Sequence, residues 1–147
     1  MKIVHIDLDN TIMDYRKAFN LSREYNPKQP YPQSQVGFFY NLVPFDYAMY
    51  SVIELMKKYD VYFLTAPSVK NPLCYTEKRL SVEKWFGLEA CNKLIISPRK
   101  DLVIGNYLID DQSDSHGQSD FVGEFIHYGS EKFPNWFSVL EYLMSKD

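Results

Sequence analysis

The sequence contains little cysteine: only Cys74 and Cys91 occur in 147 residues. Two cysteines cannot build the disulfide framework of a small secreted domain, and their spacing is not that of a metal-binding motif. We interpret both as ordinary thiols. This scarcity predicts a protein of a reducing compartment, and we expect a cytoplasmic location.

Long apolar runs are also absent. No stretch approaches the ~20 apolar residues that a membrane-spanning helix needs. The apolar run near the N-terminus ends at Asp7, too early for a signal peptide. We therefore expect a soluble chain without a membrane segment. The simplest organisation is a single domain over residues 1–147, because a chain of this length can bury roughly two thirds of its unfolded surface.

An excess of positive charge is missing as well. The chain has 16 Lys and Arg against 19 Asp and Glu, for a formal net charge of −3. A general binder of nucleic-acid polymers would carry a basic stripe, so we do not expect one here. An anionic small substrate must then be held by a few local charges or by a metal ion. A homodimer is left open.

Short apolar runs alternate with helical periodicities along the chain. They predict strands over residues 3–6, 61–64, 93–96, 107–109 and 125–128, and helices over residues 12–24, 46–58, 72–86 and 135–144. This alternation implies right-handed crossovers and a mostly parallel sheet covered on both faces. We predict a three-layer, Rossmann-like α/β fold.

Two other segments carry specific expectations. Residues 13–44, which are interrupted by Pro27, Pro30 and Pro32 and return through an aromatic cluster, are interpreted as a small cap inserted after the first strand. Asp46 is expected to start the helix that follows. Residues 112–120, rich in Ser, Asp, Gly and Gln, predict a surface loop.

Four predicted strand ends carry polar side chains. They are, in chain order, Asp7 with Asp9 and Thr11, then Thr65 beside Ala66, then Lys100, then Asp110 with Asp111. The carboxyl ends of parallel strands lie at one edge of a sheet, so these groups should converge there. Each signal alone is typical of turns, and their joint order and placement predict an active site.

The residue types favour phosphoryl transfer. Clustered carboxylates repel one another unless a divalent cation lies among them, and hard oxygen ligands favour Mg²⁺. Asp7 is the predicted nucleophile, forming an aspartyl-phosphate, and Asp9 the general acid and base. Asp110 would complete the metal site with Asp111 as its support, although the pair could exchange roles.

The remaining polar groups would bind the phosphate. The Thr65 hydroxyl, the backbone near Ala66 and the Lys100 ammonium are expected to neutralise and orient the phosphoryl oxygens. Thr11 is expected to support the turn after the first strand.

These residues resemble the four ordered motifs of the haloacid dehalogenase superfamily of phosphohydrolases. Within it, residues 64–67, 71–78 and 103–111 are similar to the 5′(3′)-deoxyribonucleotidase family. The resemblance implies that Asp7 is the nucleophile and Asp9 the acid and base. It also implies Mg²⁺ bound by Asp7, the Asp9 backbone carbonyl and Asp110, with phosphate on Thr65 and Lys100 and deoxyribonucleotides as the small-molecule phosphomonoester substrates.

The segment that returns from the insertion suggests a base pocket. By the resemblance, Phe38 and Phe39 would line the nucleoside site, where stacking on a base is worth ~1–3 kcal/mol in nucleic-acid complexes. They could equally pack the cap against the core. Lys70 is a candidate for positive potential at the rim. The insertion is shorter than in typical animal members, so the pocket itself is the part most open to change.

Two alternatives remain. A phosphatase of the same mechanism could act on a sugar phosphate or a protein phosphoester. A receiver-like signalling domain also combines acids, a Thr and a Lys in an α/β sheet. Receivers, however, place their paired acids early and the phosphorylated Asp at a middle strand, whereas this chain begins with Asp7 and Asp9 and ends with the acidic pair.

Overall fold

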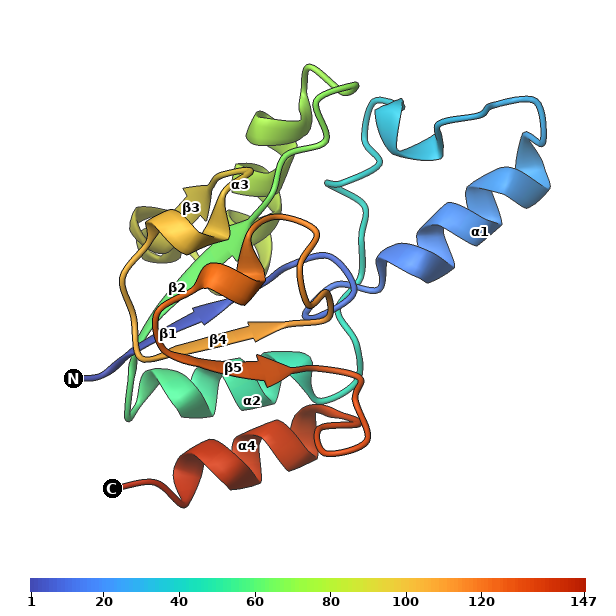
Figure 1. The fold of residues 1–147 in the computed structure, drawn as a ribbon. Helices are drawn as coiled ribbons and strands as arrows, with labels where there is room; N and C mark the ends of the chain where they lie inside the picture. Colours follow the sequence, from blue (N-terminus) through green and yellow to red (C-terminus); the bar gives the residue numbers. More distant parts are fainter.

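A single parallel sheet of five strands organises the chain (Figure 1). The computed structural model describes residues 1–147. The strand order is β3-β2-β1-β4-β5, and every pairing is parallel. The strands are β1 Ile3–Ile6, β2 Asp60–Thr65, β3 Leu94–Ile96, β4 Tyr107–Asp110 and β5 Glu124–His127. This arrangement confirms the predicted α/β class with a Rossmann-like sheet.

Each of the four predicted helices is present, with its ends shifted by no more than three residues. They are α1 Tyr15–Tyr25, α2 Ala48–Met56, α3 Cys74–Phe86 and α4 Trp136–Met144. The 3-10 segments are η1 Pro32–Ser34, η2 Leu88–Lys93, η3 Lys100–Leu102 and η4 Gln118–Asp120. None of the helices is long and apolar enough to cross a membrane.

Local sequence signals explain most helix ends. The Asp14 side chain accepts from the Lys17 N–H at the start of α1, and Asn135 forms a capping box at the start of α4. Gly87, with φ +93°, ends α3. The prediction for Asp46 was wrong: α2 follows Tyr47, whose backbone is left-handed and whose side chain caps nothing. An acidic residue before a helix was therefore a misleading start signal here.

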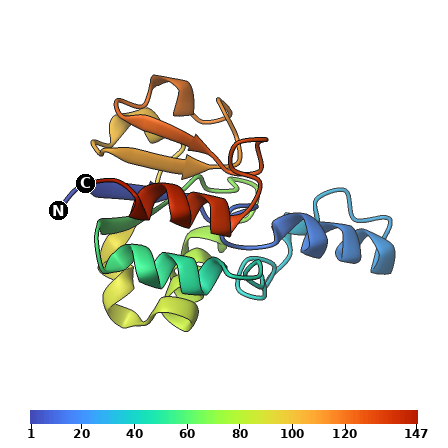
Figure 2. The same cartoon turned by 90° about the horizontal axis from the view of Figure 1, so that it is seen from below.

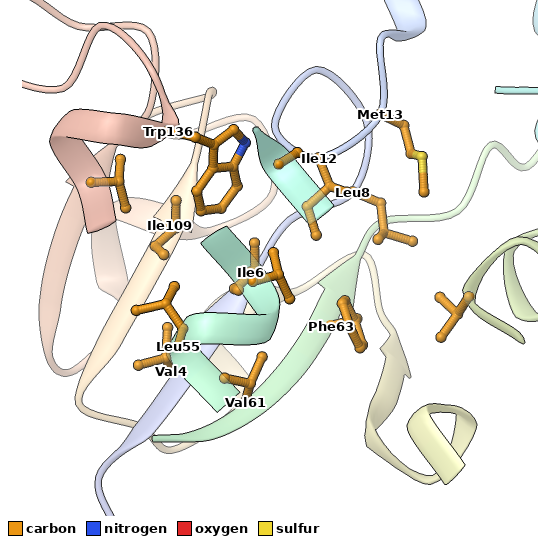
Figure 3. Close-up of a cluster of buried hydrophobic side chains, with 14 of the residues drawn as sticks. Val4, Ile6, Leu8, Ile12, Met13, Leu55, Val61, Phe63, Ile109 and Trp136 are labelled. Atoms are coloured by element: carbon orange, nitrogen blue, oxygen red, sulfur yellow. The ribbon is translucent and has the colours of Figure 1, made fainter. Parts of the chain in front are cut away.

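The main core lies between the sheet and helices α2 and α4, which run side by side over one face (Figure 2). Val4 and Ile6 of β1 pack there with Leu55 of α2 and Trp136 of α4 (Figure 3). The Trp136 indole N–H also donates to the Thr11 carbonyl at 2.8 Å. The last helix is thereby attached to the turn that follows β1.

The opposite face is covered differently. Leu64 and Leu108, whose neighbours in the strands face the main core, form a smaller cluster with Phe121. The connections from β3 to β4 and from β4 to β5 contain 3-10 segments instead of α-helices. Irregular segments therefore cover this face, and one of them, residues 111–123, also passes the active edge.

The chain leaves the sheet directly after β1 and returns before α2. Met13 and Pro44 form an isolated antiparallel bridge, so the two ends of this excursion lie together. Between them, α1 and the following segment extend away from the sheet beyond the strand ends (Figure 1). The rings of Tyr15, Phe38 and Phe39 pack against one another at its base, with centroid separations of 5.3 to 6.2 Å. That this excursion acts as a cap remains a prediction.

Candidate active site

The turn after β1 brings Asp7 and Asp9 to the same side. The Leu8 carbonyl accepts the N–H groups of Thr11, Ile12 and Met13, so the chain curls as soon as the strand ends. Asn10 takes a left-handed backbone conformation with φ 62°. In an extended strand the two aspartates would point to opposite faces. Because the backbone curls, both line one cavity.

This cavity, of about 220 Å³, opens at the carboxyl edge of the sheet. It is lined by every residue predicted for catalysis, metal binding or phosphate binding, namely Asp7, Asp9, Thr65, Ala66, Lys100, Asp110 and Asp111. Residues from four strand ends therefore meet in space, as the parallel topology requires.

Only one of the three residues predicted to bind the substrate lines this cavity. Phe39 lines the cavity, whereas Phe38 and Lys70 do not. Phe38 is buried in the core, and the Lys70 ammonium lies over the Tyr31 ring, 3.7 Å from its centroid. Tyr15 also lines the cavity, without having been predicted. The structure brings only Phe39 of the three together with the catalytic edge.

A buried ammonium lies between two of the acids. Lys100 Nζ donates to Asp7 Oδ1 at 2.8 Å and to Asp110 Oδ2 at 2.6 Å. Burial opposes the charge of Lys100, but the two carboxylates outweigh it and hold its pKa above the ordinary value. Lys100 therefore carries a fixed positive charge at the floor of the cavity.

Negative charge still exceeds positive charge around Asp7. Burial raises the pKa of Asp7 to about 6, against the opposing effect of Lys100, and Asp110 and Asp9 add to the rise. Burial and the nearby Asp7 raise the pKa of Asp111 to about 6 as well. One oxygen from each of Asp7, Asp110 and Asp111 lies within 4.8 Å of the others. Three carboxylates this close fit a hard divalent cation.

The two acids at the end of β4, Asp110 and Asp111, differ in their partners. Asp110 is fully hydrogen-bonded, accepting from Lys100 and Gln118 Nε2 on Oδ2 and from the Gln112 N–H on Oδ1. The Asp111 carboxylate has no cationic partner: it accepts from the Gln112 side-chain amide at 3.0 Å, and the Thr11 hydroxyl, which is closer to Asp7, lies 3.4 Å away. Asp111 is therefore the acid of this pair with the greater need for an added cation.

Thr11 supports this arrangement as expected of it. Its buried hydroxyl donates to Asp7 Oδ2 at 3.0 Å and accepts the Asp111 N–H at 3.2 Å. It does not line the cavity. Thr11 therefore links the turn after β1 to the end of β4.

Lys78 is a site residue that the sequence reasoning missed. It extends from α3, is 2% exposed, and donates to Asp9 Oδ2 at 2.7 Å and to Thr65 Oγ1 at 2.6 Å. A signal was available. Cys74, Lys78 and Ser81 occur at the helical spacing of one face, and all of them are buried. A lysine on the buried face of a helix indicates a buried anionic partner.

Gln118 was also missed, because the composition of residues 112–120 predicted a surface loop. That prediction was wrong for Gln118, which is 2% exposed, lines the cavity and holds Asp110. The neighbouring His116 lines the cavity too, and its carbonyl accepts the Lys100 N–H. The sequence alone does not distinguish a polar loop that is exposed to solvent from one whose side chains are buried against residues of other strands.

Comparison with known proteins agrees with this geometry. No family model matches the chain. The chain is 37% identical over 147 residues to a putative 5′(3′)-deoxyribonucleotidase of Vibrio phage KVP40, covering 99% of this chain and 86% of the relative. It is 31% identical over 113 residues to a putative 5′(3′)-deoxyribonucleotidase of Bordetella pertussis, and 28% identical over 137 residues to the human cytosolic-type 5′(3′)-deoxyribonucleotidase.

The match to the Bordetella protein covers 74% of this chain and 61% of that relative, and the match to the human protein covers 87% of this chain and 62% of that relative. The fold, the cluster of acids with Lys100 at the strand ends, and these relatives together define a phosphoric monoester hydrolase of the haloacid dehalogenase type. The match to the phage protein, which extends over nearly the whole of this chain, identifies the family within that class. The chain belongs to the 5′(3′)-deoxyribonucleotidase family.

Proposed function

We propose that this protein is a Mg²⁺-dependent phosphatase that hydrolyses nucleoside monophosphates, 5′(3′)-deoxyribonucleotides in particular, through an aspartyl-phosphate. The observation that carries the proposal is the placement of Asp7 and Asp9 in one cavity with Lys100 and Thr65, with the buried Lys78 directly behind Asp9 and Thr65. The names of the relatives, 5′(3′)-deoxyribonucleotidases, support the substrate class.

Asp7 is suited to be the nucleophile. Lys100 holds one of its oxygens and the Thr11 hydroxyl the other, so the carboxylate is fixed at the cavity floor. One Asp7 oxygen would form a bond to phosphorus while the bond from phosphorus to the ester oxygen breaks. Asp9 would give its proton to the departing alcohol, then take one from the water that cleaves the aspartyl-phosphate and regenerates Asp7.

The phosphate would bind between the two lysines. Lys100 contacts Asp7, Lys78 contacts Thr65, and Thr65 and Ala66 form part of the cavity wall. Positive charge on both sides would stabilise the charge that develops on the phosphoryl oxygens. Lys78 would also orient the carboxylate of Asp9.

The cluster of carboxylates fits a Mg²⁺ ion, which when bound would neutralise and polarise the phosphoryl oxygens. The backbone carbonyl of Asp9 remains a proposed ligand beside Asp7. We assign the remaining carboxylate ligand to Asp111, exchanging the roles first given to the pair, because Asp110 is already held by Lys100 and Gln118. Asp110 would then fix Lys100.

The nucleoside part would lie against the insertion. Residues 13–44 would act as the cap, and Phe39 with Tyr15 would form the aromatic wall of the pocket. Phe38, which packs edge-on to both rings, would support that wall from the core. Free thiols at Cys74 and Cys91 suit the expected cytoplasmic location.

A phosphate-release assay tests the proposal. The substrates are 5′- and 3′-deoxynucleotides, ribonucleotides, sugar phosphates and p-nitrophenyl phosphate, each with Mg²⁺ and with EDTA. Wild type should be most active on deoxynucleotides, and Asp7→Asn and Asp9→Asn should lose activity by orders of magnitude. Preference for a sugar phosphate would keep the mechanism and reject the substrate class. Equal release by wild type and Asp7→Asn on every ester would reject the mechanism.

A further inference from the structure

Glu77 is a buried carboxylate with no role in the reaction described above. It lies on α3, one residue before Lys78, and is 6% exposed. It forms no ion pair. Its Oε2 accepts the Gly37 N–H at 2.8 Å, and its Oε1 accepts the N–H groups of Phe39 at 3.1 Å and Tyr40 at 3.4 Å. A buried charge is costly unless it is hydrogen-bonded, and here one segment of backbone supplies all three donors.

The segment depends on Glu77 in return. Residues 37–40 belong to no helix or strand, so their N–H groups need partners from elsewhere. The Phe38 N–H donates to the Gln35 carbonyl, and the other three N–H groups of the segment donate to Glu77. Without this carboxylate, three donors would lose their acceptor.

Two aromatic side chains of the segment, Phe39 and Tyr40, also contact the same helix. The Lys78 ammonium lies 4.8 Å from the Phe39 ring centroid, and the Lys84 ammonium lies 4.7 Å from that of Tyr40. Helix α3 thus contacts the segment in two ways. Glu77 accepts hydrogen bonds from the backbone of the segment, and Lys78 and Lys84 lie over the rings of Phe39 and Tyr40. Because Phe39 lines the cavity, the position of this segment sets one wall of the site.

We propose that Glu77 is a positioning residue that anchors residues 37–40 to α3 and so keeps Phe39 at the wall of the substrate cavity. This inference rests on the proposed function, since the wall matters only if a nucleoside lies against it. Glu77 touches neither the phosphate site nor the reacting atoms. Its loss should weaken binding of substrates that carry a base and leave small phosphate esters unaffected.

The test compares Glu77→Gln with Glu83→Gln, a partly exposed glutamate of the same helix. The glutamine amide keeps one acceptor oxygen but turns an NH₂ donor towards the backbone N–H groups. Glu77→Gln should raise KM for a deoxynucleoside monophosphate roughly tenfold, the effect of about one hydrogen bond to a charged group. Its kcat and KM for p-nitrophenyl phosphate should stay within about twofold of wild type. Glu83→Gln should change neither substrate.

Amide hydrogen exchange measured by NMR supplies an independent readout. In Glu77→Gln the amides of Gly37, Phe39 and Tyr40 should exchange faster, while those of β1 keep their rates. Glu77→Asp, which keeps the charge and shortens the side chain, should show a smaller change and serves if the glutamine variant does not fold.

Each outcome is decisive. Unchanged exchange at residues 37–40 would overturn the anchoring. Equal losses towards both esters, with faster exchange throughout the chain, would show a general structural role and overturn the inference. If wild type hydrolyses p-nitrophenyl phosphate but no nucleoside monophosphate, the proposed substrate class fails, and with it the role of the wall, whereas the exchange rates still test the anchor.

Discussion

Neutralising Asp111 should stabilise the metal-free protein. Its pKa lies above the ordinary carboxyl value because burial and the charge of Asp7 disfavour the ionised form. The folded chain therefore binds more protons than the unfolded chain between pH 3.8 and about 6, and stability falls as pH rises through that window. The shift corresponds to roughly 3 kcal/mol for a fully buried group, and partial exposure of Asp111 reduces it to about 1–2 kcal/mol.

Neutralising Asp110 should have the opposite effect. This side chain is 1% exposed and accepts three hydrogen bonds, one of them from the buried Lys100. Asp110→Asn would leave that ammonium with Asp7 alone. Breaking a buried ion pair typically costs about 3–5 kcal/mol, and the remaining partner keeps the expected loss near the lower limit, about 3 kcal/mol.

Denaturant unfolding at pH 7.5, with EDTA and with Mg²⁺, measures both effects. With EDTA, Asp111→Asn should be more stable than wild type and Asp110→Asn less stable. A concentration of Mg²⁺ about 100 times Kd should add about 2.7 kcal/mol to wild type, and Asp111→Asn should lose this gain. If Asp111→Asn keeps the full gain while Asp110→Asn loses it, Asp110 is the ligand and the assignment made here is refuted.

Three further predictions concern the site and its support. Lys78→Met should lower kcat on p-nitrophenyl phosphate by about 10²–10³, as loss of one buried donor to a transition state does; an unchanged kcat would remove Lys78 from the phosphate site. Phe39→Leu should raise KM for nucleotides more than for p-nitrophenyl phosphate, whereas Phe38→Leu should lower the melting temperature and leave the ratio of the two KM values as in wild type. Trp136→Phe removes the hydrogen bond to Thr11 and should cost about 1–2 kcal/mol in denaturant unfolding, whereas the exposed Phe137→Leu should cost less than 0.5 kcal/mol, within the usual range of about ±0.5 kcal/mol for surface positions.

The sequence predicted those features that depend on local patterns and on parallel topology. Apolar runs located all five strands, and the polar groups at their ends defined the active edge. The sequence did not predict the residues that reach the site from a helix or a loop and bind its acids. Lys78 enters the site from a helix, and Gln118 enters it from a loop whose composition suggested solvent exposure. Both residues satisfy buried charges on other elements, which a linear pattern does not reveal.

Adjacent residues of α3 connect the chemistry with the insertion. Glu77 and Lys78 are one residue, or about 100°, apart on the helix, so one side chain reaches the insertion while the next reaches Asp9 and Thr65. A helix is stiff over this distance, so the backbone of residues 37–40 and the Lys78 ammonium are fixed relative to each other. If phosphate binds beside Lys78 as proposed, its distance from Phe39 is set by α3, and not by the long excursion of residues 13–44. Changes in the length of that excursion, away from residues 37–40, should therefore alter substrate preference less than substitution of Glu77 does.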